Sequence, residues 1–172
     1  MSFDDYFIAL LQRFPVWTTP IFSFATFMAS GLVLVGIAVF TGGIALRQQR
    51  ADIALAVALC LTGGGVSNVI KLAFRRPRPL TAYEMQFNVV THYSFPSGHS
   101  ASSLLVYGLL GYLALMYLPG AWAAVLGSVA AVFIVLIGMS RVYLGAHFPS
   151  DVIGGWVFGG VILLLTVQLF LP

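Results

Sequence analysis

The chain of 172 residues is 60% hydrophobic and only 8% charged. Soluble domains are about 45–50% apolar and about 25% charged, and disordered chains are richer still in charge, so the composition excludes both classes. The single cysteine, Cys60, excludes an intramolecular disulfide framework and a cysteine-based metal cage. The formal net charge of +3 is too small and too dispersed to indicate nucleic-acid binding. The composition therefore predicts an integral membrane protein with one domain, residues 1–172.

The N-terminal segment, residues 1–16, is amphipathic. Apolar residues recur at helical spacing from Phe3 to Phe14, and Asp4 and Asp5 lie on the opposite side. About a dozen residues are too few to cross a bilayer, so we expect an interfacial helix lying on the membrane surface. The alternative is a sixth, poorly hydrophobic span.

The rest of the chain contains apolar runs of the length that a membrane-spanning helix requires, about 20 residues. We therefore expect an all-α bundle of five transmembrane helices, or six if the N-terminal segment also spans. The expected spans are residues 20–46, 52–74, 99–118, 121–140 and 149–171.

The orientation follows from the charges at the ends of the spans. Alternating spans place the 41–51 turn on one side, and the 75–98 loop and the 141–149 turn on the other. Arg47 and Arg50 favour the cytoplasm for the first side. We therefore expect a multi-pass protein of the plasma (inner) membrane, with the long loop on the external, periplasmic side.

The same alternation brings many polar residues into one layer, because spans two to five all end or begin there. Ionisable groups near membrane depth are costly and by default indicate a functional site. The expected layer contains Lys71, Arg75, Arg76, Arg78, Ser97, His99, Ser140, Arg141, His147 and Asp151.

This set of side chains suits phosphate chemistry. Arginine and lysine bind phosphate oxygens, and the predicted helix start at Pro96–His99 offers backbone N–H groups, with Gly98 allowing close approach. Asp151 can accept a hydrogen bond from one ring nitrogen of His147, which leaves the other nitrogen free to attack phosphorus. His99 can then protonate the leaving oxygen. The chain has too few carboxylates for the usual Mg²⁺ site, so we expect neither a metal nor a cofactor.

Three segments resemble the signatures of a known family. Lys71, followed after six residues by Arg78-Pro79, is similar to the first signature. Pro96-Ser97-Gly98-His99 is similar to the second, and Ser140-Arg141, His147 and Asp151 have the spacing of the third. With all three in order between residues 71 and 151, the chain resembles the type 2 phosphatidic acid phosphatase family of membrane lipid phosphatases. That family shares its core with vanadium haloperoxidases and bacterial acid phosphatases.

The resemblance implies a helical core and metal-independent hydrolysis through a phosphohistidine on His147. It implies that Asp151 orients that ring and that His99 is the general acid. The phosphate-binding residues implied are Lys71, Arg78, Ser97, Gly98 and Arg141. Many family members have six full spans, so the short N-terminal segment is a departure in length.

We expect a phosphatase acting on a membrane lipid. Candidate substrates are undecaprenyl diphosphate, slightly favoured, phosphatidylglycerol phosphate, phosphatidic acid and the phosphate of lipid A. The alternative is a phosphotransferase that passes the phosphoryl group to another lipid. A non-catalytic lipid-binding or transport protein and a haloperoxidase are further alternatives, and the oligomeric state is left open.

Several residues keep two interpretations. Arg75 and Arg76 are candidate headgroup contacts, or they anchor a helix end at the membrane surface. Glu84 and His92 are expected in a solvated loop. Small residues such as Gly155 and Gly159 favour close helix packing within the chain over a dimer interface.

Overall fold

The computed structural model describes residues 1–79 and 93–171, so Glu84 and His92 lie outside the described residues. Within those two ranges the chain forms seven α-helices and one 3₁₀ helix, and the only β-type pairing is an isolated bridge between Pro77 and Tyr93. The expectation of an all-α bundle is confirmed. The elements are α1 Phe3–Leu11, η1 Val16–Thr18, α2 Thr19–Met28, α3 Gly31–Arg47, α4 Ala51–Phe74, α5 Gly98–Tyr117, α6 Gly120–Tyr143 and α7 Pro149–Phe170.

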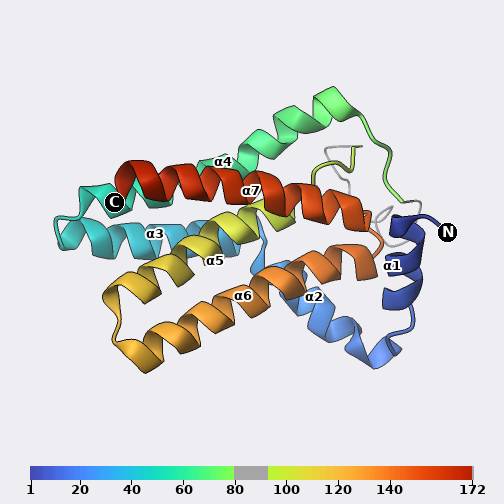
Figure 1. The fold of residues 1–172 in the computed structure, drawn as a ribbon, viewed down its shortest axis with the longest axis horizontal. Coiled ribbons are helices and arrows are strands. Elements are labelled where there is room, and N and C mark those ends of the chain that lie inside the picture. The colour runs from blue at the N-terminus through green and yellow to red at the C-terminus, as the bar shows by residue number, and fades with distance from the viewer. Residues whose placement is uncertain (80–92, 172) are drawn as a thin grey trace.

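Helix α5 forms the centre of the bundle, packed against α4, α6 and α7 (Figure 1). Helix α7 approaches it closely because two glycines face α5. A Cβ atom at Gly159 would lie 2.7 Å from the carbonyl oxygen of Ala101, and one at Gly155 would lie 2.5 Å from that of Ser97. Small residues let membrane helices come this close. The predicted use of these glycines for packing within the chain is confirmed.

Helices α4, α5, α6 and α7 are each long and apolar enough to cross a membrane. Helices α2 and α3 pass the same test only as a pair that is bent by 50°, so the described residues contain four spans, or five if the pair counts as one. The expected first span, residues 20–46, is therefore not one continuous helix but two helices with a bend between them.

The break between α2 and α3 has identifiable hydrogen bonds. Ser30 is the N-cap of α3, and its side chain accepts a bond from the N–H of Val33 at 3.5 Å. The hydroxyl of Tyr107 on α5 donates to the carbonyl of Met28 at 2.7 Å, at the end of α2. Backbone groups inside a bilayer need protein partners. A serine that caps and a tyrosine that reaches across therefore stabilise the bend.

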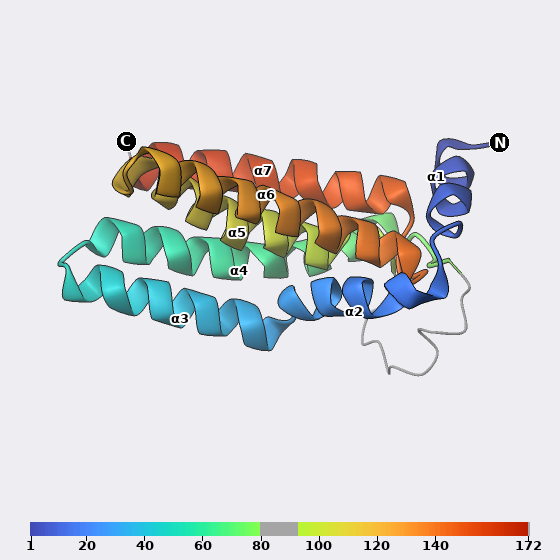
Figure 2. The ribbon, with the colours of Figure 1, turned by 90° about the horizontal axis from the view of Figure 1, so that it is seen from below.

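Helix α1 lies across one end of the bundle, roughly perpendicular to the long helices (Figure 2). Leu11 is buried against Val142 and Val152, while Phe3 and Tyr6 are exposed. The helix has nine residues, which at about 1.5 Å per residue is about half of the hydrocarbon thickness. A short helix is present where one was expected, and α1 is too short to be a sixth span, while its place on the membrane surface stays a prediction.

Candidate active site

The ends of α4 and α6 and the starts of α5 and α7 lie at the end of the bundle that α1 covers (Figure 2). The backbone N–H of Ser97, before α5, donates to the carbonyl of Asp151 on α7 at 2.9 Å. The N–H of His147 donates to the carbonyl of Arg141 on α6 at 3.0 Å. These bonds tie the helix ends together, and they bring the residues of the second and third signatures into one layer.

His147 and Asp151 lie side by side at the start of α7. The Nδ1 atom of His147 is 3.6 Å from Oδ2 of Asp151, which is longer than a hydrogen bond, and both side chains are buried. Oδ2 accepts a bond from the N–H of Phe148 at 2.9 Å instead. The carboxylate therefore caps α7 and faces the imidazole at the same time. Catalytic hydrogen bonds are often this long before substrate binds.

The surroundings of His147 favour its neutral form. Burial lowers the pKa of His147 to about 4, and the positive charges of Arg141 and Arg78 act in the same direction, against the opposing effect of Asp151. At neutral pH the ring is therefore unprotonated, which is the form that a nucleophile requires.

The start of α5 faces the same layer. Ser97 is the N-cap, and its hydroxyl accepts a bond from that of Ser100 at 2.9 Å. A Cβ atom at Gly98 would lie 3.9 Å from the ammonium nitrogen of Lys71 and 3.2 Å from the hydroxyl of Ser67. Glycine therefore leaves room beside Lys71. The N–H groups in the first turn of a helix have no partners within the helix and form a ready site for phosphate.

The positive side chains come from three different segments. Lys71 on α4 and Arg141 on α6 are buried, and a guanidinium nitrogen of Arg78 donates to the carbonyl of Ala146 at 3.3 Å. Arg141 contacts the hydroxyl of Thr26 on α2 at 3.4 Å. His99 lies within electrostatic range of Lys71, Arg78, Arg141 and His147. The structure thus collects the predicted catalytic and phosphate-binding residues around one point.

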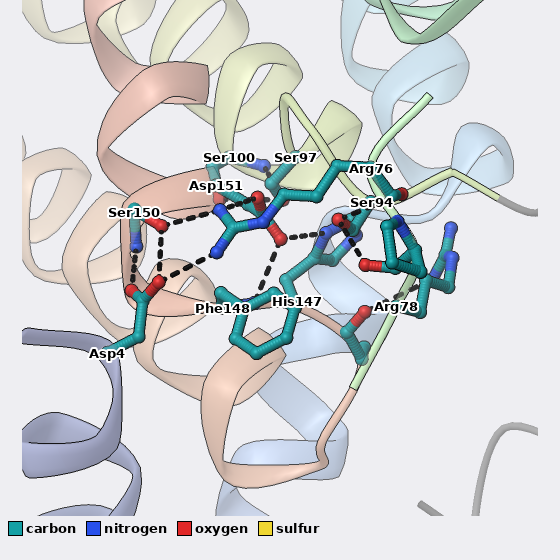
Figure 3. A network of polar contacts seen from close by, with 12 residues as sticks. Asp4, Arg76, Arg78, Ser94, Ser97, Ser100, His147, Phe148, Ser150 and Asp151 are labelled. Atoms are coloured by element: carbon teal, nitrogen blue, oxygen red, sulfur yellow. Dashed lines mark hydrogen bonds and ion pairs between the residues drawn. The ribbon is translucent and has the colours of Figure 1, made fainter. Parts of the chain in front are cut away.

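Arg75 and Arg76 have different surroundings. Arg75 ends α4 in a left-handed conformation, and its exposed side chain donates to the carbonyl of Leu72 at 3.1 Å. Arg76 turns inward and donates to the carboxylates of Asp151 and Asp4, each at 2.8 Å (Figure 3). Arg75 is therefore open to the surroundings, whereas Arg76 is held inside a polar network.

The sequence profile of the PAP2 superfamily matches residues 52–171, which is more than half of the chain. The matched range contains the site residues described above, apart from Asp4 on α1 and Thr26 on α2. The chain belongs to the PAP2 superfamily. The resemblance inferred from the three signatures is confirmed, and the chain is a membrane-bound phosphatase.

Individual PAP2 relatives extend the match. Phosphatidylglycerophosphatase B of Bacillus subtilis is 32% identical over 163 residues, 91% of this chain and 77% of the relative. An undecaprenyl-diphosphatase of Sulfolobus acidocaldarius is 43% identical over 79 residues, 46% of this chain and 34% of the relative. The crystal structure of a transmembrane PAP2-type phosphatidylglycerolphosphate phosphatase from Bacillus subtilis superposes with a TM-score of 0.79 at 28% identity. It covers 96% of this chain and 83% of that one.

Two residues near this PAP2 site were not anticipated from the sequence. Asp4 was recognised only as part of the polar side of α1, yet its carboxylate contacts Arg76 and Ser150. Thr26 was one polar residue in an apolar run, yet its hydroxyl lies 2.6 Å from that of Ser140 and contacts Arg141. Each contacts residues more than 70 positions away in the sequence, and no local sequence pattern predicts such contacts.

Proposed function

We propose that this protein hydrolyses the phosphate or diphosphate of a membrane lipid through a phosphohistidine on His147. One observation carries the proposal. A buried, neutral imidazole lies beside a buried carboxylate, at the point where Arg78 and Arg141 approach it from two segments. A neutral nucleophile surrounded by cations is suited to attack on an anionic phosphorus centre.

The roles follow from the placement of each group. Nε2 of His147 attacks phosphorus, the P–N bond forms and the bond to the leaving oxygen breaks. Asp151 stabilises the positive charge that develops on the ring. Lys71, Arg78 and Arg141, with the backbone at Ser97 and Gly98, hold the phosphate oxygens. His99, protonated once the phosphate anion is bound beside it, supplies the proton that the leaving oxygen takes up.

The second half of the cycle reverses these roles. Neutral His99 takes a proton from a water molecule, whose oxygen attacks phosphorus and breaks the P–N bond. Inorganic phosphate leaves, and His147 returns to its neutral form. If a lipid hydroxyl replaces the water, the same residues carry out phosphoryl transfer, so the identity of the acceptor distinguishes a hydrolase from a phosphotransferase.

The substrate class is a phosphorylated lipid, because the layer lies at one end of a membrane-spanning bundle. Phosphatidylglycerol phosphate is the first substrate to test, since the relatives matched over most of this chain carry that name. Undecaprenyl diphosphate comes next because of the match to the relative from Sulfolobus acidocaldarius. We place the site on the external, periplasmic face of the plasma membrane, opposite Arg47 at the other end of the bundle.

The test is phosphate release by purified protein in detergent, with these two lipids, phosphatidic acid and lipid A as substrates. His147→Ala is expected to reduce release by at least about 10³-fold, and His92→Ala, at the third histidine of the chain, serves as the matched control. Labelled substrate should leave an acid-labile phosphate on the wild type and none on His147→Ala. Activity retained in His147→Ala would overturn the proposal, and label found on an added acceptor lipid would indicate a phosphotransferase.

A further inference from the structure

The guanidinium of Arg76 connects two carboxylates from opposite ends of the sequence (Figure 3). One terminal nitrogen donates to Oδ1 of Asp151 at 2.8 Å, and the other donates to Oδ2 of Asp4 at 2.8 Å. The centre of the guanidinium also lies 4.2 Å from the centroid of the Phe148 ring. The planar, two-pronged guanidinium allows one side chain to hold both carboxylates.

Asp4 is attached to α7 as well as to Arg76. Its Oδ1 accepts a bond from the backbone N–H of Ser150 at 2.9 Å, and its Oδ2 accepts one from the Ser150 hydroxyl at 2.8 Å. Ser150 is in the first turn of α7, where an N–H has no partner within the helix. Burial opposes ionisation of Asp4, but the bonds from Ser150 and Arg76 outweigh it and lower the pKa of this carboxyl. Asp4 is therefore a charged side chain at neutral pH.

Helix α1 fixes where Asp4 lies. Leu11 is packed against the ends of α6 and α7, while Phe3 and Tyr6 remain exposed as expected for a helix at the membrane surface. The position of the Asp4 carboxylate is thus set by packing at one end of α1 and by its bonds to Ser150.

The network constrains Asp151 in geometry and in charge. Oδ1 is occupied by Arg76 and Oδ2 by the N–H of Phe148, so Oδ2 stays on the side of His147. Arg76 alone would cancel the charge of Asp151 and weaken its support of a positively charged ring. With Asp4 present the three groups carry one net negative charge, which remains available to His147.

We propose that Asp4, acting through Arg76, is a positioning residue that orients Asp151 and preserves its negative charge for His147. This inference rests on the proposed function, in which His147 is the nucleophile. It assigns to the N-terminal helix a part in the chemical step.

The test compares Asp4→Asn with Asp5→Asn in purified protein. Both changes remove one charge from the same helix, but among residues 1–79 and 93–171 Asp5 bonds only to Ser2, within its own capping box. Asp4→Asn is expected to lower kcat by about tenfold, the lower end of the range for outer partners of catalytic groups, with KM changed less than about twofold. Asp5→Asn should match the wild type. Asp4→Glu, which keeps the charge, should recover most of the lost kcat.

The double variant Asp4→Asn/Arg76→Gln separates a shared role from two independent ones. If Asp4 acts through Arg76, the double variant will have the kcat of Arg76→Gln alone. Equal kcat in Asp4→Asn and Asp5→Asn, a raised KM at unchanged kcat, or multiplicative losses in the double variant would each overturn the inference. If His147→Ala remains active, the proposed function itself fails. If His147→Ala is inactive while Asp4→Asn matches Asp5→Asn, only the positioning role fails.

Discussion

The Nδ1 atom of His147 lies 3.6 Å from Oδ2 of Asp151, with one side chain before the start of α7 and the other in its first turn. The same Oδ2 accepts the N–H of Phe148 at 2.9 Å. One carboxylate thus caps the helix and supports the proposed nucleophile. Because the cap needs only an acceptor and the nucleophile needs a charge, the two roles of Asp151 are separable by mutation.

Asp151→Asn tests that separation. The asparagine oxygen still accepts the Phe148 N–H, so the cap is kept, and any fall in melting temperature is expected to come from the lost ion pair with Arg76. Loss of the negative charge beside His147 is expected to lower kcat by roughly 100-fold or more, because the imidazolium that forms in the transition state loses its partner. Phosphate release measures the catalytic role of Asp151, and thermal unfolding in the same detergent measures its role in capping α7. A variant that is active but unfolds early would contradict the assignment.

The pH dependence follows from the environment of His147. Burial lowers the pKa of His147 to about 4, so the ring becomes protonated and inactive only near that pH. The ordinary pKa of a histidine is about 6.5. We expect protonation of His147 to leave kcat/KM unchanged until the pH falls well below that pKa. Asp151→Asn removes a group that raises this pKa and should move the acid limb to lower pH. A wild-type acid limb near 6.5 that moves to lower pH in Asp151→Asn would contradict this prediction.

The contact between α5 and α7 predicts a specific effect on stability. In Gly159→Ala the new methyl group meets the carbonyl oxygen of Ala101, whereas a Cβ atom at Gly36 on α3 meets nothing within 4 Å. Overpacking costs typically about 1–3 kcal/mol. Gly159→Ala should therefore unfold at a lower temperature than the wild type in detergent, and Gly36→Ala should not. Equal melting curves for the two variants would contradict the close contact between α5 and α7 at Gly159.

The orientation in the membrane can be tested because Cys60 is buried and is the chain's single cysteine. Arg75→Cys introduces an exposed thiol at the end of α4 beside the site, and Gln48→Cys introduces one at the opposite end of the bundle. A membrane-impermeant thiol reagent added to intact cells should label the first and not the second. The reverse pattern would place the site on the cytoplasmic side.

A mechanism that uses only groups of the protein itself predicts how inhibitors act. Chelation with EDTA should leave phosphate release unchanged, because histidine, lysine and arginine side chains supply the groups that the proposed reaction needs. Vanadate should inhibit competitively, because it mimics phosphate among the same cations. Loss of activity on chelation, restored by added divalent metal, would rule out this form of the mechanism.

Much of the site could be predicted from the sequence because its residues lie at the ends of consecutive spans. Alternating spans bring the end of α4 and the start of α5 to the same face as the end of α6 and the start of α7. Lys71, His99, Arg141 and His147 therefore had to gather in one layer. The spacing of the three signatures was sufficient to identify the family, which the match over residues 52–171 confirmed.

Other features depend on contacts between distant parts of the chain. The bend after Met28 is stabilised by Ser30 together with Tyr107 from α5, and an apolar composition alone predicted a continuous span. Arg76 was ambiguous in the sequence, and its ion pairs with Asp4 and Asp151 join residues 72 and 75 positions apart.

The amino-acid sequence by itself determined the membrane class, the short N-terminal helix and the signature residues that lie in the layer. These properties follow from local composition, helical period and span length. The tertiary structure decided which nitrogen meets which oxygen: Arg76 with Asp4, Asp151 with the Phe148 N–H, and Thr26 with Arg141. Hydrogen bonds act over about 3 Å, so such pairings are fixed only when packing has set the rotation and depth of every helix.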